Sequence, residues 1–476
     1  EAVLPSVRVM LSTVSFSHGV SSKGTLVARA HISNTRRFVS GGRSGVIRCD
    51  AGSSYDVDVA IIGSGPGGLA VAHRLLQKGI TPHVYERAKV LRPIGAVLGL
   101  ATMGFEALEA IDLDMAQEIH DAGNAPSIRQ IYHPSGELFN ETSLENYYSE
   151  EKPRWPFKWI GWWDLQGSLR RRLPVPDPDS LISLDHKLES FTILEEGEGG
   201  VHLRFENGKE VRARVLVGAD GINSVVRAGT VCDGPPVFRD TMTWRGRFSG
   251  TTMQDMGFKE GVEFVMVRSI EQAWCVGRGA GRAGEGKNFT LVHLDSSVCW
   301  GGTSEWPADN PRPDPGAGGV DKYKRALGLM EGMPDFCRKS VELTDPDAIV
   351  EYAIWDRDPS DKWGEGPVTL LGDAAHPMRP SMGMGTQTTL ADAVALGDSL
   401  GSAWDKGTEE VCAALREYER VRQEFTAPFV LKSREEGTKI HNKDRIKVWG
   451  GQKKYSSGNK AQLVEVTSVD DASEAS

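Results

Sequence analysis

The stretch that decides the fold is DVDVAIIGSGPGGLAVAHRLLQKGITPHVYE, residues 56–86. It opens with a β-branched run that ends at Ile62, passes through a glycine-rich turn, and then spaces its apolar residues helically as far as Leu76. A strand, a glycine turn and a helix in this order predict the start of a βαβ unit that binds a dinucleotide. The competing interpretation, a glycine-rich turn without a ligand, explains the turn but not its flanking strand and helix.

The glycines of this turn and the acid that follows have separate physical roles. Gly63 permits a tight turn, Gly65 lets the backbone approach a pyrophosphate, and Gly68 lets the helix lie close to the sheet. Gly67 belongs to the same turn, and the N-terminus of the helix offers free N–H groups to phosphate oxygens. Glu86 ends the second expected strand about 20 residues further on, where a carboxylate accepts hydrogen bonds from ribose hydroxyls.

Length and composition exclude several classes of protein. A chain of 476 residues is long enough for two or three domains. A formal net charge of −10 argues against broad nucleic-acid binding. No uninterrupted apolar run is long enough to span a bilayer. The six cysteines are scattered without zinc-ligand spacing, so we predict neither a metal site nor a disulfide scaffold.

The first 54 residues differ from the rest of the chain. They are rich in Arg and Ser and contain no acid between Glu1 and Asp50. This composition is typical of an organelle transit peptide, so we predict one, without fixed structure, over residues 1–54. The serine content favours a plastid over a mitochondrion, which stays as the alternative. An extension without a targeting role is the competing interpretation.

Two further stretches repeat the order of strand, turn and acid. The apolar residues 211–218 lead into Asp220 and Gly221, and a later apolar stretch leads into Gly372 and Asp373. Ligands of an open α/β sheet bind beyond the carboxyl ends of its strands. We therefore expect three strand ends, far apart in the sequence, to converge on one extended cofactor.

The three motifs also resemble those of a known family. GSGPGG (63–68), GADGINSVVR (218–227) and LLGDAAHPMRP (370–380) are similar to the motifs of the single-component FAD-dependent aromatic hydroxylases, the para-hydroxybenzoate hydroxylase-like monooxygenases. Salicylate-hydroxylase-like and zeaxanthin-epoxidase-like members look most similar. The resemblance implies an α/β protein with a Rossmann-like FAD-binding domain, a second, mostly antiparallel β-sheet substrate domain, and C-terminal helices.

The order of expected strands, helices and motifs along the chain predicts how the chain is divided, and the tail is assigned from its polar composition. The expected segments are the FAD-binding domain in three parts (55–130, 211–235 and 353–431), mixed segments of both domains (131–210), the substrate domain (236–352) and a disordered tail (432–476). The family's members act as monomers or homodimers on small molecules, with O2 and NAD(P)H as co-substrates, so we expect the same here.

Most cofactor contacts are assigned by carrying the motifs over residue by residue. The implied FAD-binding residues are Gly63, Gly65, Gly67, Gly68, Glu86, Arg87, Arg129, Asp220, Gly221, Gly372, Asp373, Pro377, Gly383, Gly385, Thr386 and Gln387. Two positions depart from the family's pattern. Gln387 stands where the family often has Asn, and Trp162 stands where a helix of the family usually has a cofactor-side Arg.

The implied reaction is monooxygenation. In this family NAD(P)H reduces FAD, O2 adds at flavin C4a to give a hydroperoxide, and one oxygen atom passes to an aromatic or isoprenoid substrate. We predict no catalytic base and interpret His376 as structural. The substrate wall is expected from apolar residues on strands of the second domain, although such residues are more often part of a core than of a pocket lining: Met242, Trp244, Phe264, Met266 and Trp274.

Two other functions fit the same motifs. One is a flavin oxidoreductase of the same fold that inserts no oxygen, such as a reductase-like or cyclase-like enzyme. The other is a non-catalytic FAD-binding or redox-sensing protein. Substrate-stimulated NAD(P)H oxidation with O2 uptake distinguishes a monooxygenase from both.

Overall fold

The computed structural model describes residues 19–20, 26–27, 55–92, 97–144, 153–194, 199–268, 287–294, 297–306, 310–313 and 318–439. Within residues 1–54 it describes only a short antiparallel ribbon, β1 (Gly19–Val20) with β2 (Leu26–Val27). The rest of the expected transit peptide lies outside the described residues. Among the described helices, none combines the length and the apolar character needed to cross a bilayer.

The first sheet is built on the glycine-turn strand, β3 (Val57–Ile62). Its strand order is β10-β11-β12-β3-β4-β9, with β18 paired to β12. The strands β12, β3, β4, β9 and β18 are parallel, and β10 and β11 are antiparallel, so the sheet is mixed as expected. The other bounds are β4 Pro82–Tyr85, β9 Ile182–Ser183, β10 Leu188–Ile193, β11 Val201–Phe205, β12 Glu210–Gly218 and β18 Val368–Leu370.

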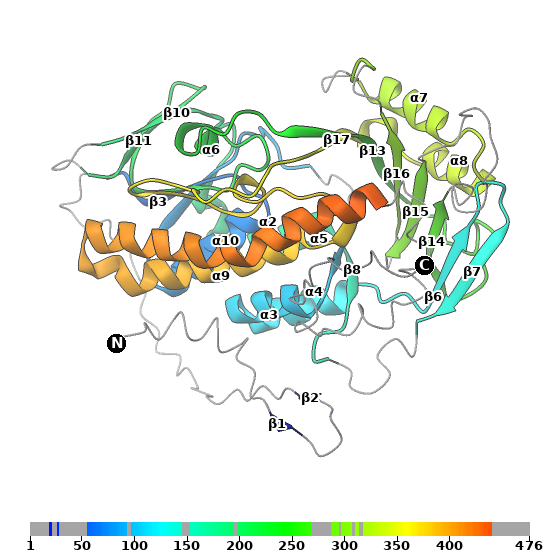
Figure 1. Ribbon diagram of the computed structural model, residues 1–476, viewed down its shortest axis with the longest axis horizontal. Helices are drawn as coiled ribbons and strands as arrows, with labels where there is room; N and C mark the ends of the chain where they lie inside the picture. Colours follow the sequence, from blue (N-terminus) through cyan, green and yellow to red (C-terminus); the bar gives the residue numbers. More distant parts are fainter. Residues whose placement is uncertain are drawn as a thin grey trace, which may run out of the picture.

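Helices from both ends of the chain cover this sheet. The glycine-turn helix α2 packs against α9, and α10 packs along α9, so the C-terminal helices lie beside the first βαβ unit (Figure 1). The helices of this domain are α2 Pro66–Gln77, α3 Thr102–Ile111, α4 Leu113–Ala122, α5 Trp162–Arg171, α6 Val225–Thr230, α9 Gly385–Ala403 and α10 Thr408–Lys439. Their apolar faces and the sheet form one continuous core.

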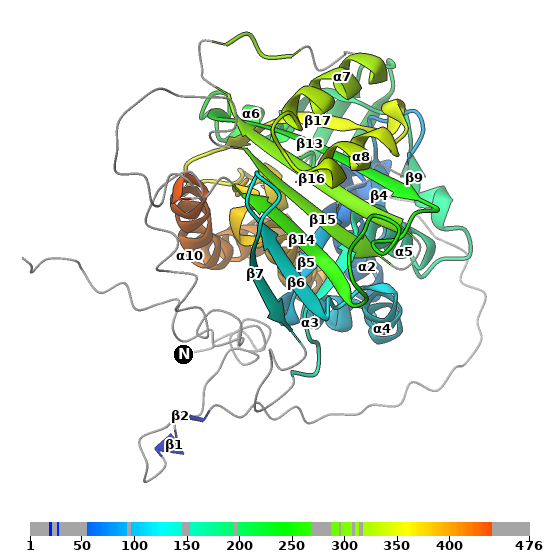
Figure 2. The same ribbon diagram turned by 90° about the vertical axis from the view of Figure 1, so that its right-hand side faces the viewer.

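The second sheet is almost entirely antiparallel, in the order β17-β13-β16-β15-β14-β6-β7. Its bounds are β6 Ile128–Tyr132, β7 Leu138–Ser143, β13 Val237–Ser249, β14 Val262–Arg268, β15 Asn288–Leu294, β16 Ser297–Glu305 and β17 Val350–Asp356. We call the face covered by α7 (Gly319–Leu329) and α8 (Asp335–Glu342) the outer face (Figure 2). The opposite, inner face lies toward the first domain, where the ribbon β5 (Val97–Leu100) and β8 (Lys158–Gly161) touches it.

The last helix extends beyond its expected end. The sequence predicts a disordered tail from residue 432, and this boundary is wrong, because α10 continues to Lys439. The buried Ser433 hydroxyl accepts a hydrogen bond from the Arg379 amide at 3.2 Å, and Arg434 pairs with the buried carboxylate of Asp356 at 3.0 Å. These tertiary contacts stabilise a polar segment that composition alone does not favour. Residues 440–476 lie outside the described part of the chain.

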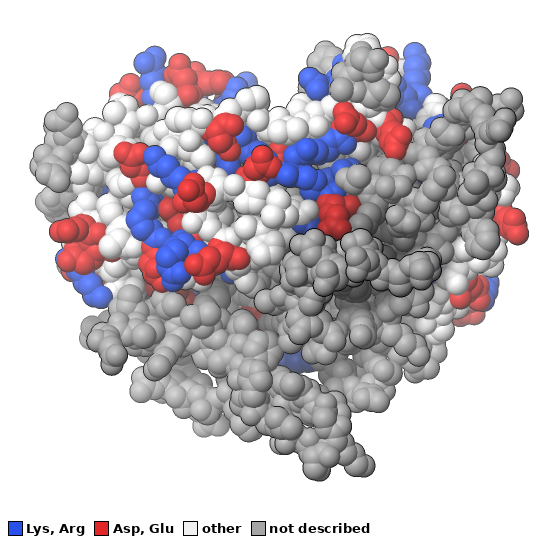
Figure 3. Space-filling view, in the orientation of Figure 1, with Lys and Arg blue, Asp and Glu red and all other residues white. Residues whose placement is uncertain are grey.

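The exposed side of α10 is a solvated, mixed-charge surface. Acidic and basic side chains lie interspersed along it (Figure 3). Arg420, for example, pairs with Glu417 at 2.8 Å and with Glu424 at 3.0 Å. Such exposed pairs contribute little to stability and mainly keep the surface hydrophilic.

Candidate functional site

The carboxyl ends of three parallel strands lie side by side. The central strand β12 pairs with β3 on one side and with β18 on the other. Backbone bonds continue past the strand ends: the Ala219 amide donates to Ile62 O at 2.9 Å, and the Leu371 amide donates to Gly218 O at 2.9 Å. The three sequence motifs therefore meet at one edge of the sheet, as predicted.

The glycine turn is shaped by close backbone contacts on one side and open space on the other. Gly63 has φ +106°, and a Cβ there would collide with Ala219 O. A Cβ on Gly68 would collide with Gly63 O, and one on Gly67 would lie 2.5 Å from a methyl group of Thr389 on α9. A Cβ on Gly65, in contrast, meets nothing within 4 Å. The turn thus leaves space where Gly65 borders the N-terminus of α2, which is where a pyrophosphate binds in such units.

Glu86 is held against this turn. Its carboxylate accepts hydrogen bonds from the Ser64 amide and the Ser64 hydroxyl, both at 2.9 Å, and from the Ala88 amide at 2.8 Å. A carboxylate has about four acceptor sites, so Glu86 retains capacity for a ribose hydroxyl. The neighbouring Arg87 is exposed and follows the strand end directly.

Two acids follow the other strand ends. Asp220 accepts from the Val225 amide at 2.7 Å, while its other oxygen is buried without a partner among the described residues. Burial raises the pKa of Asp220, and the hydrogen bonds that its carboxylate accepts from Ser224 and from the Val225 and Val226 amides oppose the rise. Asp373 is accessible to solvent, yet the protein surrounds it so closely that burial raises its pKa too.

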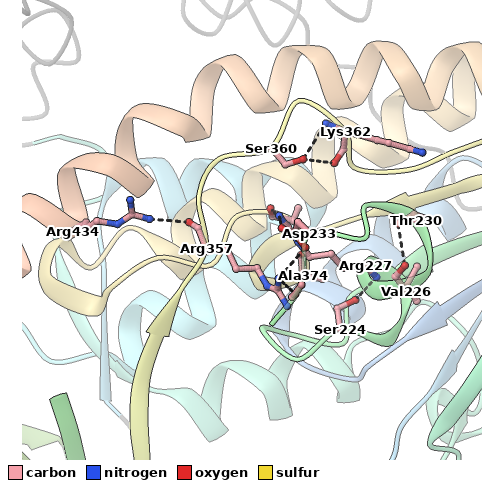
Figure 4. A network of polar contacts seen from close by, with 12 residues as sticks. Ser224, Val226, Arg227, Thr230, Asp233, Arg357, Ser360, Lys362, Ala374 and Arg434 are labelled. Atoms are coloured by element: carbon pink, nitrogen blue, oxygen red, sulfur yellow. Dashed lines mark hydrogen bonds and ion pairs between the residues drawn. The ribbon is translucent and has the colours of Figure 1, made fainter. Parts of the chain in front are cut away.

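A buried arginine ties the second motif to the third. Arg227 has no exposed side-chain surface, and one of its guanidinium nitrogens donates to Ala374 O at 3.0 Å and to Ala375 O at 2.6 Å (Figure 4). Its charge is paired with Asp233 at 2.6 Å, and Asp233 also pairs with Arg357 at 2.9 Å. Burial would raise the pKa of Asp233, but the two arginines lower it. The motif residue Arg227, which the sequence did not single out, therefore fixes the backbone around Asp373.

The third motif is fixed from behind by a second buried charge group. His376 lies 2.5 Å from Asp392 on α9, and Asp392 also pairs with Arg422 of α10 at 2.6 Å. Burial would raise the pKa of Asp392, but His376 and Arg422 lower it. His376 is buried on the α9 side of its loop, in keeping with a structural role.

Two glutamine side chains make hydrogen bonds that connect loops of the site to neighbouring helices. Gln387, at the start of α9, donates to Gly383 O at 3.0 Å and accepts from the Ala101 amide at 3.3 Å, so it joins the Gly383 loop to α3. Gln166 is buried on α5, one turn after Trp162, and donates to Ser64 O in the glycine turn at 2.7 Å. The sequence did not indicate Gln166, because its partner is 102 residues away.

The remaining cofactor candidates lie in two places. Gly221 (φ +77°) and Gly383 (φ +64°) adopt backbone conformations that favour glycine, and a Cβ on either meets nothing within 4 Å. Pro377, Gly385 and Thr386 lie in the adjoining loop and the first turn of α9. Arg129 lies elsewhere, on β6 of the second sheet, where it donates to Thr142 at 3.3 Å, so the structure does not bring it to the three strand ends.

The predicted substrate residues divide between the two faces of the second sheet. Phe264 packs on the inner face against Trp159 of β8, with ring centroids 5.2 Å apart, and Met266 lies on the same face two residues on. Trp244 lies on the outer face, in the core under α7 and α8, and donates to Glu351 at 2.6 Å. The structure therefore does not support Trp244, or its neighbour Met242, as a substrate residue. Trp274 lies outside the described residues.

The residues present fit FAD. The converging strand ends supply an open glycine turn and a solvent-accessible carboxylate in Asp373, and the end of the neighbouring strand β4 supplies Glu86, an acid with spare acceptor capacity. These are the contacts that a pyrophosphate, a ribose and a polyhydroxy chain require.

Comparison with known proteins agrees with this geometry. A family model described as "FAD binding domain" matches residues 56–272 and 336–432. The chain is 30% identical over 375 residues to the aurachin C monooxygenase/isomerase of Stigmatella aurantiaca, covering 79% of this chain and 87% of that protein. It is 30% identical to the 3-amino-4-hydroxybenzoate 2-monooxygenase PtnB3 of Streptomyces platensis, covering 82% and 90%.

A further relative is the chloroplastic zeaxanthin epoxidase of Nicotiana plumbaginifolia, also 30% identical. The match covers 77% of this chain but only 52% of that protein, so the chain spans about half of its length. Among solved structures, Klebsiella pneumoniae HpxO complexed with FAD and uric acid has the same fold, with a TM-score of 0.65 and 23% identity, covering 83% of this chain and 92% of HpxO. The chain therefore belongs to the FAD-binding monooxygenase family, with FAD as its cofactor.

Proposed function

We propose that the protein is an NAD(P)H-consuming monooxygenase that inserts one atom of O2 into an aromatic or isoprenoid small molecule. The observation that carries the proposal is the position of the inner sheet face, whose apolar side chains Phe264, Val292 and Cys299 lie opposite the FAD-binding domain. Two relatives at 30% identity are named for oxygenation of an aromatic compound and epoxidation of zeaxanthin, respectively.

The bound flavin supplies the redox and oxygen chemistry, and the protein contributes binding, orientation and exclusion of water. The turn at Gly65 and the Glu86 carboxylate would hold the nucleotide end of FAD, and Asp373 would hold the chain that leads to the flavin ring. The first turn of α9, from Gly385, would offer backbone N–H groups and a positive helix end to the ring, which would favour negative charge there. Phe264 and its neighbours keep the reacting region apolar.

Substrate-stimulated turnover tests this proposal. The purified full chain with FAD should consume NAD(P)H faster in the presence of a substrate from a panel of phenols, aminophenols and carotenoids. Isotopically labelled O2 should place one label in the product. Flavin reduction without label in any product would favour the oxygen-free oxidoreductase, and bound FAD without any stimulated turnover would favour the non-catalytic protein.

We also propose that residues 1–54 direct the protein to an organelle, a plastid in preference to a mitochondrion. The support is their basic, serine-rich composition, which contains no acid between Glu1 and Asp50. Chloroplastic and bacterial relatives are equally similar in sequence, so they do not decide between the two. Import of the full chain and of residues 55–476 into isolated plastids and mitochondria tests the proposal, which fails if both versions enter equally or neither enters.

A further inference from the structure

The loop that joins the third motif to α9, residues 377–384, has little internal structure of its own. Pro377 and Pro380 have no amide N–H to donate, and Gly383 has φ +64°. The Gly383 amide donates to Pro380 O at 3.1 Å, which closes one short 3-10 turn at Pro380–Met382. Contacts from other elements therefore decide where this loop lies.

One buried residue near the end of α10 makes two hydrogen bonds to the loop. The Ser433 hydroxyl accepts from the Arg379 amide at 3.2 Å, and the Ser433 carbonyl accepts from the Ser381 hydroxyl at 2.6 Å. The same Ser433 hydroxyl donates to Val430 O, one turn earlier in α10, at 2.8 Å, which fixes its orientation. Ser433 has no exposed surface, so these bonds form in an interior of low dielectric constant, where they are strong.

The loop is also tied to the second sheet. The Arg379 guanidinium donates to the Thr241 hydroxyl on β13 at 3.3 Å, and Arg379 is only 8% exposed. Burial lowers the pKa of Arg379, and the charge of Asp356 opposes this change. Arg379 thus links α10 to the second sheet, because its amide contacts Ser433 and its guanidinium contacts Thr241.

The residue after Ser433 holds the end of α10 independently of the loop. Arg434 donates to the Asp356 carboxylate at 3.0 Å, to Asp358 at 2.8 Å and, as Figure 4 shows, to the Arg357 carbonyl at 3.2 Å. Asp356 is wholly buried and is the last residue of β17, at the edge of the second sheet. A change of the Ser433 side chain therefore alters the loop without detaching the helix.

We propose that Ser433 is a positioning residue for oxygen transfer and acts through the loop 377–384. The loop leads from the turn that carries Asp373 to the first turn of α9, both assigned above to the flavin, and Arg379 ties it to the sheet that carries Phe264. Ser433 thereby fixes how the ring side of the cofactor site lies relative to the substrate wall. This inference rests on the proposed function, because it concerns the same site.

A loosened loop should change the fate of O2 more than the rate at which NAD(P)H is consumed. In the coupled reaction NAD(P)H supplies two electrons, one oxygen atom enters the substrate, and the other leaves as water. Without transfer to the substrate, O2 takes up the same two electrons and two protons and leaves as H2O2. Because a displacement of about 1 Å is enough to impair a transfer step, the fraction of oxidised NAD(P)H recovered as H2O2 reports the position of the loop.

Ser433→Ala tests the inference in the FAD-loaded full chain. The variant removes the acceptor of the Arg379 amide and should raise the H2O2 fraction at least threefold, while the KM for NAD(P)H and the affinity for FAD change less than twofold. Iodide quenching of the flavin fluorescence, measured without substrate or NAD(P)H, should rise at least twofold, because the loosened loop covers the ring less well. Ser433→Thr keeps the hydroxyl and should return both quantities toward their native values.

Two matched controls separate positioning from general stability. Ser402→Ala removes the same kind of bond, from a helical serine hydroxyl to the carbonyl three residues earlier (Ser399 O, 2.8 Å), at the far end of α9. Trp300→Phe lowers stability by removing a buried bond to the Thr344 hydroxyl (2.8 Å) in the core under α7 and α8. Both variants should keep the native H2O2 fraction and the native quenching.

Native coupling and native quenching in Ser433→Ala would overturn the inference, and so would an equal change in Trp300→Phe, which would trace the effect to stability. If Ser433→Ala does not fold, as judged by circular dichroism, Ser381→Ala decides, because it removes the other bond between the loop and Ser433 and should raise both quantities in the same direction. The failure of the proposed function would look different. The native protein would then place no labelled oxygen in any product, while the difference in quenching between Ser433→Ala and the native protein would remain.

Discussion

Arg227 donates a hydrogen bond to the backbone carbonyl of Ala375 at 2.6 Å, across 148 residues of sequence. This contact joins α6, which follows β12, to the loop that follows β18, so that the two cofactor motifs cannot move independently. Because Arg227 is wholly buried and its charge is paired, the joint is rigid rather than a surface contact. The position of Asp373 is therefore set by a residue that need not touch the cofactor.

Arg227→Lys should weaken FAD binding at least tenfold while leaving the residues around the glycine turn in place. Lysine keeps the charge but cannot make the forked set of bonds to Asp233 and the two carbonyls. A buried carbonyl that loses its hydrogen-bond donor costs about 1–3 kcal/mol, so the unfolding free energy should fall as well. Fluorescence titration of the apoprotein with FAD and urea unfolding measure both. Arg204→Lys, at an exposed pair with Glu189, is the control and should change neither quantity.

Two glycines of the same turn should respond differently to alanine. Gly68→Ala should prevent stable folding of the first domain, because its Cβ would collide with Gly63 O. Gly65→Ala should fold normally, since its φ of −65° suits alanine and nothing lies within 4 Å, but should bind FAD at least tenfold more weakly. Gly328→Ala, which also meets nothing within 4 Å, should leave both properties unchanged. Circular dichroism and FAD titration measure the outcome. Normal FAD affinity in Gly65→Ala would show that the pyrophosphate does not pass this residue.

The motifs could be predicted because each is local. The second and third motifs each hold strand, turn and acid within about a dozen residues, the first lies within residues 56–86, and parallel strands bring their carboxyl ends to one edge of a sheet. The contacts of Gln166 with Ser64 and of Arg227 with the third motif could not be predicted, because they join residues more than a hundred positions apart. The end of α10 was missed for the same reason, since Ser433 and Arg434 are held by distant partners.

The division of the substrate candidates has a different cause. Strand β13 alternates between apolar residues such as Trp244 and polar ones such as Arg245, and apolar residues were expected to form the pocket. In the folded protein α7 and α8 bury the apolar face of β13. The polar face of this strand is the one that lies toward the cofactor domain. Sequence alternation identifies two faces, but it does not say which face a helix several strands later will cover.

Asp392→Asn should destabilise the protein by about 3–5 kcal/mol, because it leaves the buried Arg422 without its carboxylate. The neighbouring charges lower the folded pKa of Asp392, so the ionised form stabilises the fold above the unfolded pKa, and this contribution is lost as the pH falls through the lower folded value. The difference in unfolding free energy between native and variant should therefore shrink as the pH falls from about 5 to about 2. Urea unfolding across this range measures it. Glu424→Gln, at an exposed pair, should cost less than about 1 kcal/mol, and an equal loss in both variants would contradict the argument.

Trp244→Phe and Phe264→Leu should separate the core of the second domain from its substrate wall. Trp244→Phe removes a buried hydrogen bond to Glu351, whose carboxylate keeps both bonds from Arg325 at 2.6 Å, so the unfolding free energy should fall by about 1–3 kcal/mol. Its substrate affinity should be unchanged, because the indole lies on the outer face under α7 and α8. Phe264→Leu changes the inner wall and should alter substrate affinity several-fold, with a smaller loss of stability. Flavin absorbance titration and urea unfolding of both variants test the pair, and reduced substrate affinity in a fully folded Trp244→Phe variant would return that residue to the pocket.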